Sequence, residues 1–137
     1  MPNVLRLVAL IVLLAAPVAV LAESPAQPRI DFVYFGAADC PYCQAWEAKD
    51  LPKLKAAPGF QKVRFTKVTK MIPSPVPSAT WFPDEIKHLR NPIAAQIKGA
   101  GSPMFAIAAD GKVVAAWKGT RKNPGDILKI IEDQNGQ

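Results

Sequence analysis

The sequence has little of several residue types and patterns on which large classes of protein depend. It holds two cysteines and one histidine, His88, among 137 residues, which argues against histidine-rich metal chemistry. No segment recurs with a period of about 20 to 50 residues, so solenoids and propellers are excluded. The length suffices for one compact domain with its own hydrophobic core and is too short for two ordinary domains.

The charged residues lack any block of one sign. Lys and Arg number 17 against 11 Asp and Glu, which gives a formal net charge of +6. The basic residues are scattered from Lys49 to Lys129 among acidic ones, with no stacked aromatics between them. A nucleic-acid or anionic-membrane surface needs its cations in one patch. The sequence therefore predicts a solvated basic surface and no nucleic-acid partner.

An apolar run long enough to span a membrane is also missing. The one candidate follows Arg6, covers residues 7–16 and ends at Pro17, whereas a membrane span needs roughly 18 to 20 apolar residues. The run Val20-Leu21-Ala22 then stands where a signal peptide has the small residues of its cleavage site. The pattern is typical of a cleaved secretory signal peptide rather than of an uncleaved anchor.

These features divide the chain into three expected parts. We expect residues 1–22 to be the signal peptide, 23–29 a linker with two prolines, and 30–137 the folded domain. A cleaved export signal predicts a periplasmic location and no membrane span in the mature protein.

The first half of the domain alternates strand and helix patterns. Residues 30–35 form a compact apolar and aromatic run, which is typical of a central strand. From Pro41 onward apolar residues recur at helical spacing, and Pro52 predicts a kink or break near Asp50 because it removes a helical donor. Residues 63–68 mix polar and apolar side chains, which suits an edge strand.

The second half opens with a proline-rich stretch, residues 69–82, for which we expect an exposed loop and a tolerated insertion. Residues 83–98 carry two helix starts before a stop at glycine. Asp110-Gly111 predicts a hairpin between strands at 104–108 and 113–118. A last amphipathic helix opens at Asn123-Pro124.

The order of these elements is strand, helix, strand, helix, hairpin, helix. A strand, helix, strand unit calls for a parallel crossover, whereas a hairpin is antiparallel. The sequence therefore predicts an α/β fold with a mixed four-stranded sheet, in the order βαβαββα, and helices on both faces.

The two cysteines stand three positions apart, in the motif Cys40-Pro41-Tyr42-Cys43. A structural disulfide is one interpretation for an exported chain, but closing so short a loop stabilises a fold by only roughly 2 kcal/mol. A redox pair explains the spacing better, because Cys40 stands at a helix N-cap where free amides favour a thiolate. Cys43, one turn further on, is placed to attack a mixed disulfide at Cys40. A carboxylate on Asp39 near the sulfur would oppose this by raising the Cys40 pKa.

Together these motifs carry a resemblance to a known family. The strand at 30–35, the Cys40–Cys43 motif, the run Gly101-Ser102-Pro103-Met104-Phe105 and the Asp110-Gly111 hairpin resemble the thioredoxin superfamily over about residues 29–135. The resemblance implies a thioredoxin-like fold in which Pro103 is cis and faces the disulfide. It also implies that the backbone of Ser102 pairs with the substrate chain.

The sequence departs from thioredoxins proper at two places. The residue before the first cysteine is Asp39 instead of the usual Trp, and the buried Asp six positions before that cysteine is replaced by Tyr34. The usual proton acceptor is therefore missing; Glu47 is a substitute by position, although we expect a solvated glutamate there. The pair of glycines that helps glutaredoxins hold glutathione has no counterpart at 117–120, which argues against glutathione dependence. The chain looks most like small exported bacterial thioredoxin-like proteins.

For the remaining aromatic residues, Met104 and His88 we expect ordinary structural roles. We expect Trp46 and Trp81 to lie in the core or to cover it, Trp117 to pack from its strand and Met104 to be a core residue. His88 is expected on a helix surface.

The sequence thus predicts an exported thiol–disulfide oxidoreductase that needs no cofactor. Cys40 is the expected nucleophile and Cys43 the resolving thiol, and the substrate-binding residues are Pro41, Tyr42, Ser102 and Pro103. Its expected partners are thiols or disulfides of exported proteins and a membrane redox protein. Pro41-Tyr42 and the hydroxyl residue Ser102 before Pro103 favour the reductase or isomerase direction.

Two alternatives from other classes remain. One is a copper chaperone-like module in which the two cysteine thiolates bind Cu(I), with Met104 or His88 as a further ligand. The other is a redox-inert interaction domain that uses the proline-rich stretch around 73–77.

Overall fold

The protein is built around one mixed sheet, seen in a computed structural model that describes residues 26–136. The predicted signal peptide, residues 1–22, lies outside the described residues. The sheet has the strand order β2-β1-β3-β4, formed by β1 (Ile30–Gly36), β2 (Arg64–Thr69), β3 (Met104–Ala109) and β4 (Lys112–Lys118). β1 pairs parallel with β2 and antiparallel with β3, and β3 pairs antiparallel with β4. The predicted mixed sheet, with the second strand at its edge, is confirmed.

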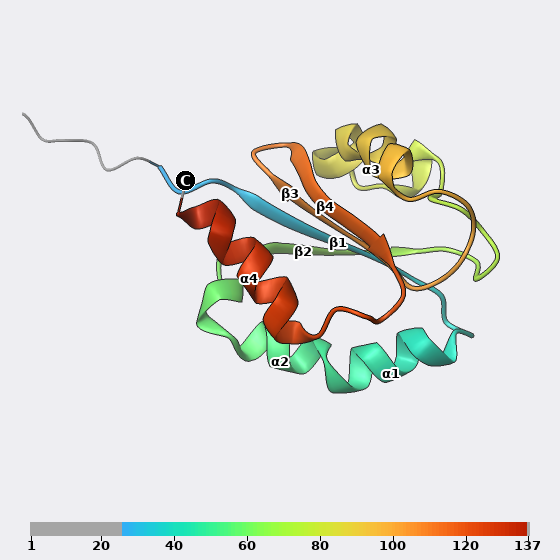
Figure 1. Cartoon of the computed structure of the whole chain (residues 1–137). Coiled ribbons are helices and arrows are strands. Elements are labelled where there is room, and N and C mark those ends of the chain that lie inside the picture. The colour runs from blue at the N-terminus through green and yellow to red at the C-terminus, as the bar shows by residue number, and fades with distance from the viewer. Residues whose placement is uncertain (1–25, 137) are drawn as a thin grey trace, which may run out of the picture.

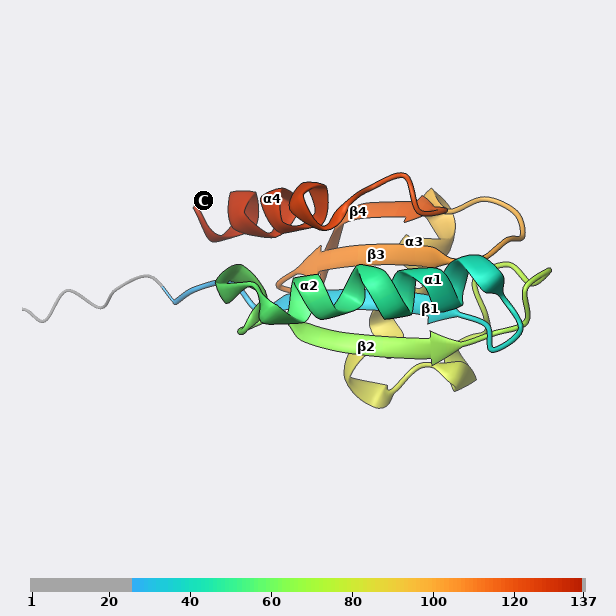
Figure 2. The ribbon, with the colours of Figure 1, turned by 90° about the horizontal axis from the view of Figure 1, so that it is seen from below.

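Helices cover both faces of this sheet, as Figures 1 and 2 show. One face carries α1 (Pro41–Lys49), α2 (Leu51–Ala56) and α4 (Pro124–Asn135), with the short 3-10 turn η1 (Pro58–Phe60) between α2 and β2. The other face carries η3 (Asp84–Leu89) and α3 (Arg90–Gln96). Within the part of the chain that the structure describes, no helix is long and apolar enough to cross a membrane.

The two layers of helices divide the core into two clusters because side chains alternate along the strands. All seven residues of β1 are buried, which is the pattern of a central strand covered on both faces. The first cluster, on the side of α1 and α4, contains Ile30, Phe32, Tyr34, Phe105 and Ile107 from the strands. The second, on the side of α3, contains Val33, Phe35, Met104, Ala106 and Ala108.

Proline and glycine divide the chain where the sequence predicted. α1 ends at Lys49, and α2 begins at Leu51 with Pro52 in its first turn, so the expected break near Asp50 is confirmed. The β3–β4 hairpin turns at Asp110 and Gly111, whose φ angles are 47° and 78°. Two adjacent residues with positive φ are what a tight two-residue hairpin requires.

The proline-rich stretch differs from the loop that we expected. It contains a 3-10 turn, η2 (Ala79–Trp81), and it buries Val76 and Phe82 in the second cluster. The expectation that Trp81 lies in the core or covers it is wrong, since the residue is 63% exposed and belongs to neither cluster. Phe82 fills the core position instead, and η2 leaves the adjacent indole on the surface.

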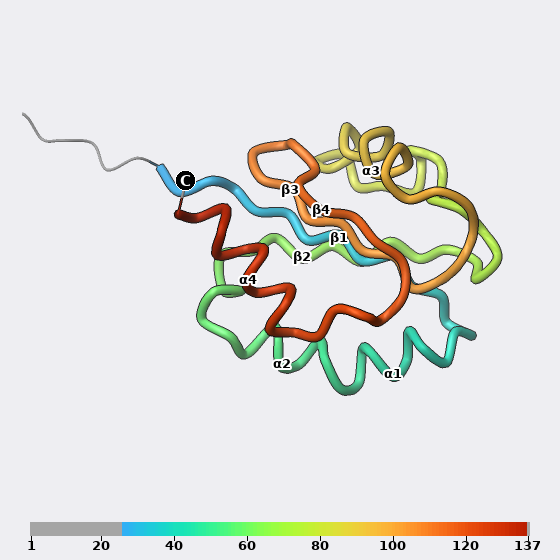
Figure 3. Tube along the Cα trace, viewed as in Figure 1, coloured from blue at the N-terminus to red at the C-terminus, as the bar shows by residue number. Residues whose placement is uncertain are grey.

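Three connections meet at one end of the sheet: the β1–α1 turn, the segment after β2 and the α3–β3 loop (Figures 2 and 3). The backbone N–H of Lys70 extends the β1–β2 pairing to this end by donating to the Gly36 carbonyl at 2.9 Å. The sheet therefore brings residues from all three connections into one region.

Candidate functional site

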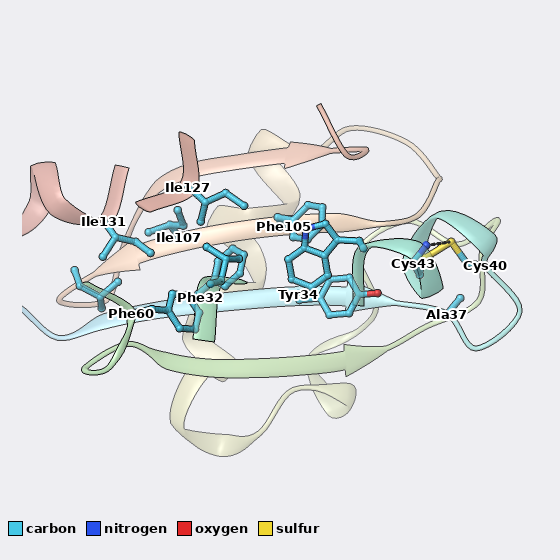
Figure 4. Packing of buried hydrophobic residues seen from close by; sticks show 13 residues of the cluster. Phe32, Tyr34, Ala37, Cys40, Cys43, Phe60, Phe105, Ile107, Ile127 and Ile131 are labelled. Carbon is cyan, nitrogen blue, oxygen red and sulfur yellow. Dashed lines mark hydrogen bonds between the residues drawn. A yellow bond between two sulfur atoms is a disulfide. The ribbon is translucent and has the colours of Figure 1, made fainter. Parts of the chain in front are cut away.

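Cys40 and Cys43 form a disulfide at this end of the sheet (Figure 4). Their Cα atoms are 5.2 Å apart, within the ordinary range for a disulfide. Cys43 is completely buried and Cys40 is 2% exposed. Cys40 is thus the more accessible cysteine of the pair.

The local geometry around Cys40 follows from its place before α1. Its backbone is extended, with φ −94° and ψ 108°, and Pro41 occupies the first turn, where no donor is needed. The Cys43 N–H donates to Cys40 Sγ at 3.1 Å, so the sulfur takes the position of an N-cap acceptor. The N-cap position expected from the sequence is confirmed. Such a donor, at the positive end of a helix, stabilises a thiolate at Cys40 relative to a thiol.

The residues around Cys40 on the chain lie on the surface. Tyr42 is 69% exposed, and the side chains of Asp39 and Pro41 are exposed as well. An exposed aromatic residue inside the motif leaves a surface for a partner beside the disulfide.

Ser102 and Pro103 precede β3 at the same end of the sheet. The peptide bond between them is cis, as the resemblance implied, and Pro103 is buried while Ser102 is partly exposed. The Pro103 carbonyl accepts from the Gly119 N–H at 2.9 Å. Among residues 26–136, no backbone hydrogen bond engages the N–H or the carbonyl of Ser102.

Lys70 links the segment after β2 to the α3–β3 loop. Nothing in the sequence indicated this role. It is 7% exposed, and its Nζ donates to four oxygens: the carbonyls of Met71, Ile72 and Gly101 and the Oγ of Ser102, at 2.8, 3.3, 2.8 and 2.8 Å. No carboxylate of the described chain pairs with it. Burial lowers the Lys70 pKa below its ordinary value.

A second polar group, formed by Tyr34, Glu47 and Lys67, lies at the edge of the first cluster, where β1, α1 and β2 meet. The Tyr34 hydroxyl donates to Glu47 Oε1 at 2.9 Å, and Lys67 Nζ donates to the same oxygen at 2.8 Å. The expectation that Glu47 is simply a solvated residue is therefore wrong, because α1 turns it onto β1. A methyl group at Gly36 would stand 2.5 Å from the Tyr34 hydroxyl oxygen, so glycine leaves the room that the tyrosine occupies.

This contact changes the pKa of both acids. Burial alone would raise the Glu47 pKa, but the hydrogen bonds from Lys67 and Tyr34 and the charge of Lys67 bring it below its ordinary value. Burial, together with the hydrogen bond to Glu47 and its charge, raises the Tyr34 pKa. Glu47 is therefore a carboxylate at neutral pH and Tyr34 a neutral phenol.

Aromatic side chains pack beside the disulfide in the same cluster (Figure 4). The Trp46 ring centroid lies 4.6 Å from that of Tyr34 and 4.8 Å from that of Phe105. Trp117 stacks on Phe105 at 5.2 Å. The predicted core role of Trp46 and the packing of Trp117 from its strand are both confirmed, and this packing holds α1 against β1 and β3.

The residues named for a copper site do not gather around the sulfurs. Among the described residues, no three histidine, cysteine or acidic side chains are close enough to hold a metal ion together. Met104 is buried in the second cluster, whereas both cysteines belong to the first. His88 is on the surface in η3, and its ring lies over Gly111 in the hairpin turn. This arrangement does not favour the copper alternative.

Comparisons with known proteins bear on the fold. No protein-family model and no curated protein matches the sequence. Thioredoxin-2 of the malaria parasite, described as a component of its protein secretion machinery, aligns over 77% of this chain and 84% of its own, with 14% identity and a TM-score of 0.51. Thioredoxin from Trypanosoma brucei brucei aligns over 81% and 79%, with 23% identity and a TM-score of 0.48. Reduced SoxS, a periplasmic thioredoxin from Paracoccus pantotrophus, aligns over 77% and 98%, with 14% identity and a TM-score of 0.46.

At these identities the likeness concerns the fold. A thioredoxin-like fold is supported by the strand order, by the helices on both faces and by the superposition on thioredoxin-2. The chain therefore has a thioredoxin-like fold with a Cys40–Cys43 disulfide at the start of its first helix.

Proposed function

We propose that the protein is an exported thiol–disulfide oxidoreductase that exchanges disulfides with other proteins through Cys40 and Cys43. The observation that carries this proposal is the disulfide at the start of α1, with the Cys43 N–H donating to Cys40 Sγ. A donor at a helix terminus stabilises the thiolate that must attack and leave in each exchange.

In the proposed reaction, electrons pass from the cysteine pair to a partner disulfide. The Cys40 thiolate attacks one sulfur of that disulfide, forms a mixed disulfide and releases the other sulfur as a thiolate, which takes up a proton. Cys43 then loses its proton to solvent and attacks Cys40 Sγ, which releases the second partner sulfur. The partner gains two electrons and two protons, and the cysteines become the disulfide seen in the structure.

The proposed substrate-binding residues flank the sulfurs. Tyr42 and Pro41 present an exposed surface in the motif, and the backbone N–H and carbonyl of Ser102 are available to pair with an extended chain. Backbone pairing gives affinity without demanding one partner sequence, which suits an enzyme that acts on several proteins.

Substitution of each cysteine tests the two roles. Cys40→Ser removes the nucleophile and is expected to abolish reduction of a protein disulfide such as that of insulin, measured with dithiothreitol as the electron donor. Cys43→Ser leaves the mixed disulfide unresolved, so a covalent adduct with the partner is expected on a non-reducing gel. Full activity of Cys40→Ser, or no adduct with Cys43→Ser, would contradict the assignment.

Location, direction and partners complete the proposal. Residues 1–22 support export to the periplasm, where a membrane redox protein would supply or accept the electrons. Pro41-Tyr42 and the hydroxyl residue Ser102 before Pro103 favour the reductase or isomerase direction. Export is tested by the N-terminus of the protein isolated from its native cells: a mature chain that starts after Ala22 is expected, and an intact Met1 would contradict export.

A further inference from the structure

The proline-rich stretch after β2 forms a groove that the proposed reaction does not use. The groove has a volume of about 540 Å³, within the range of ligand-binding pockets. Its walls include Lys70, Met71, Pro77, Trp81 and Arg90.

The apolar surface of this groove is open to solvent. Trp81 is 63% and Met71 71% exposed, and with Tyr42 and Val114 they are the exposed large hydrophobic residues of the described chain. Tryptophan and methionine are enriched where proteins bind one another and are costly to leave in water. Two of these four residues line the groove, which marks it as a surface for an apolar side chain.

Two cations line the groove without a carboxylate partner. Arg90 donates to the Pro77 carbonyl at 3.0 Å and Lys70 to the four oxygens described above. Neither forms a salt bridge within the described chain, and no acidic residue lines the groove. The positive charge is therefore not neutralised by a carboxylate, and it favours an occupant that carries one.

Lys70 makes the groove continuous with the candidate site. Its side chain lines the groove and bonds to Gly101 and Ser102, and its backbone N–H bonds to Gly36, four residues before Cys40. The groove therefore borders the segment whose backbone is proposed to pair with a partner chain.

We propose that this groove binds the polypeptide of the redox partner, by taking an apolar side chain that has a neighbouring Asp or Glu. The inference rests on the proposed function, because the occupant is a segment of the protein whose disulfide is exchanged. Contacts with Trp81 and Met71 provide the apolar part of the affinity, and Lys70 and Arg90 provide the charge preference.

Binding of short cysteine-free peptides to the oxidised protein tests the groove without any exchange reaction. The first peptide has a central Leu-Phe pair flanked by Asp, the second has Lys in place of Asp, and the third has Ser-Ser in place of Leu-Phe. Fluorescence anisotropy is expected to give a Kd about tenfold lower for the first peptide than for either of the others. Its Kd is also expected to rise as salt increases from about 0.05 M to about 0.5 M. Equal Kd values for the three peptides would overturn the proposal.

Three variants locate the binding. Trp81→Ala is expected to raise the Kd of the first peptide about tenfold, whereas Val114→Ala, which removes an exposed apolar residue on β4, is expected to leave it unchanged. Met71→Glu places a carboxylate at the groove and is expected to reduce or reverse the preference for Asp over Lys. An unchanged Kd with Trp81→Ala, or an unchanged preference with Met71→Glu, would overturn the proposal.

Two further measurements separate the alternatives. Sedimentation at increasing protein concentration is expected to show no dimer; a dimer that Trp81→Ala abolishes would identify a second copy as the occupant and overturn the proposal. Reduction of hydroxyethyl disulfide by the wild-type protein in its dithiol form reports on the cysteines alone. If the cysteines exchange but the three peptides bind equally, only the proposal about the groove is overturned. Peptide preference without exchange overturns the proposed function, and with it the redox partner as occupant.

Discussion

Tyr34 places a hydroxyl group inside a cluster of aromatic side chains, where it needs a partner. That partner is the Glu47 carboxylate, which also accepts from Lys67. The three residues come from β1, α1 and β2, so the contact fixes the helix that carries the disulfide to both strands. A buried hydroxyl without such an acceptor would cost about 1 to 3 kcal/mol.

The contribution of this hydroxyl is tested by Tyr34→Phe. A hydrogen bond to a charged acceptor is worth about 2 kcal/mol, so urea unfolding at neutral pH is expected to show a loss of this size. The Glu47 pKa is lowered in the folded state. The stabilisation by the ionised carboxylate is therefore present above its ordinary pKa of 4.5 and is lost as the pH falls through the folded-state value.

The loss on Tyr34→Phe should therefore shrink in acid. Tyr42→Phe makes the same chemical change at an exposed tyrosine and is expected to leave the free energy of unfolding unchanged. A cost of Tyr34→Phe that is the same on both sides of the Glu47 titration would contradict the account of this contact.

Lys70 is a buried cation whose hydrogen bonds all go to neutral oxygens. Lys70→Met retains a long side chain but leaves the acceptors of Met71, Ile72, Gly101 and Ser102 without their donor, so a loss of about 2 kcal/mol is expected at neutral pH. Lys49→Met, at an exposed position, is the control.

The pH dependence of the Lys70→Met effect has a definite sign. The folded-state pKa of Lys70 lies below its ordinary value of 10.5. The penalty for burying the charge is therefore complete below the folded-state pKa and is relieved as the pH rises toward 10.5. The wild type should gain stability relative to Lys70→Met over this interval, measured by urea unfolding of the oxidised protein. A constant difference would contradict the burial of a charged amine.

At the scale of elements, the β1–β2 pair begins at a buried ion pair. Asp31 is completely buried and is the register partner of Arg64, which binds its Oδ1. Arg29 reaches the other carboxylate oxygen only at 3.8 Å. Arg64 therefore provides most of the compensation for burying the Asp31 charge.

Arg64→Ala tests this pairing. It leaves a buried carboxylate with one distant cation, and loss of a partner from such a pair costs about 3 kcal/mol. Thermal or urea unfolding is expected to show this loss, while Arg121→Ala, at an exposed position after β4, should have little effect. Equal small effects of the two variants would show that the edge strand does not depend on the ion pair.

Element boundaries were the part of the structure most readable from the sequence, because each depends on local chemistry. Pro52 set the break between α1 and α2, and Asp110-Gly111 set the hairpin. Asn123 caps α4 by accepting from the Asp126 N–H at 3.0 Å, and its own N–H donates to Asp126. The stretch at 69–82 was less readable, since prolines exclude regular structure without indicating which side chains become buried.

At the scale of the whole molecule, the two-sided burial of β1 explains how the sheet supports the disulfide. The core cluster on one face contains residues of α1 and α4, including both cysteines, and the cluster on the other face contains residues of α3. The disulfide lies at the start of α1, just after the turn that follows the fully buried strand β1 (Figure 4). A rigid sheet beneath the sulfurs and an exposed Tyr42 beside them suit a site that meets another protein.

Long-range contacts are the part that the sequence did not reveal. Lys70 bonds to Gly101 across 31 positions and Tyr34 to Glu47 across 13. Hydrophobic periodicity identifies which residues face a core, but it carries no information on which polar groups from separate elements meet. The cysteine motif was readable because its residues are neighbours on one helix turn.

Equilibration of the Cys40–Cys43 pair with glutathione buffers of known ratio distinguishes a reversible exchange site from a structural crosslink. A reversible exchange site in this fold is expected to titrate between about −270 and −120 mV, toward the lower end for a reductase. Mass spectrometry of alkylated thiols gives the reduced fraction, and circular dichroism monitors whether the fold persists. Reversible reduction of the folded protein in this range is the predicted result. A disulfide that stays oxidised below about −300 mV, or that is reduced only when the chain unfolds, would identify a structural crosslink and contradict the account.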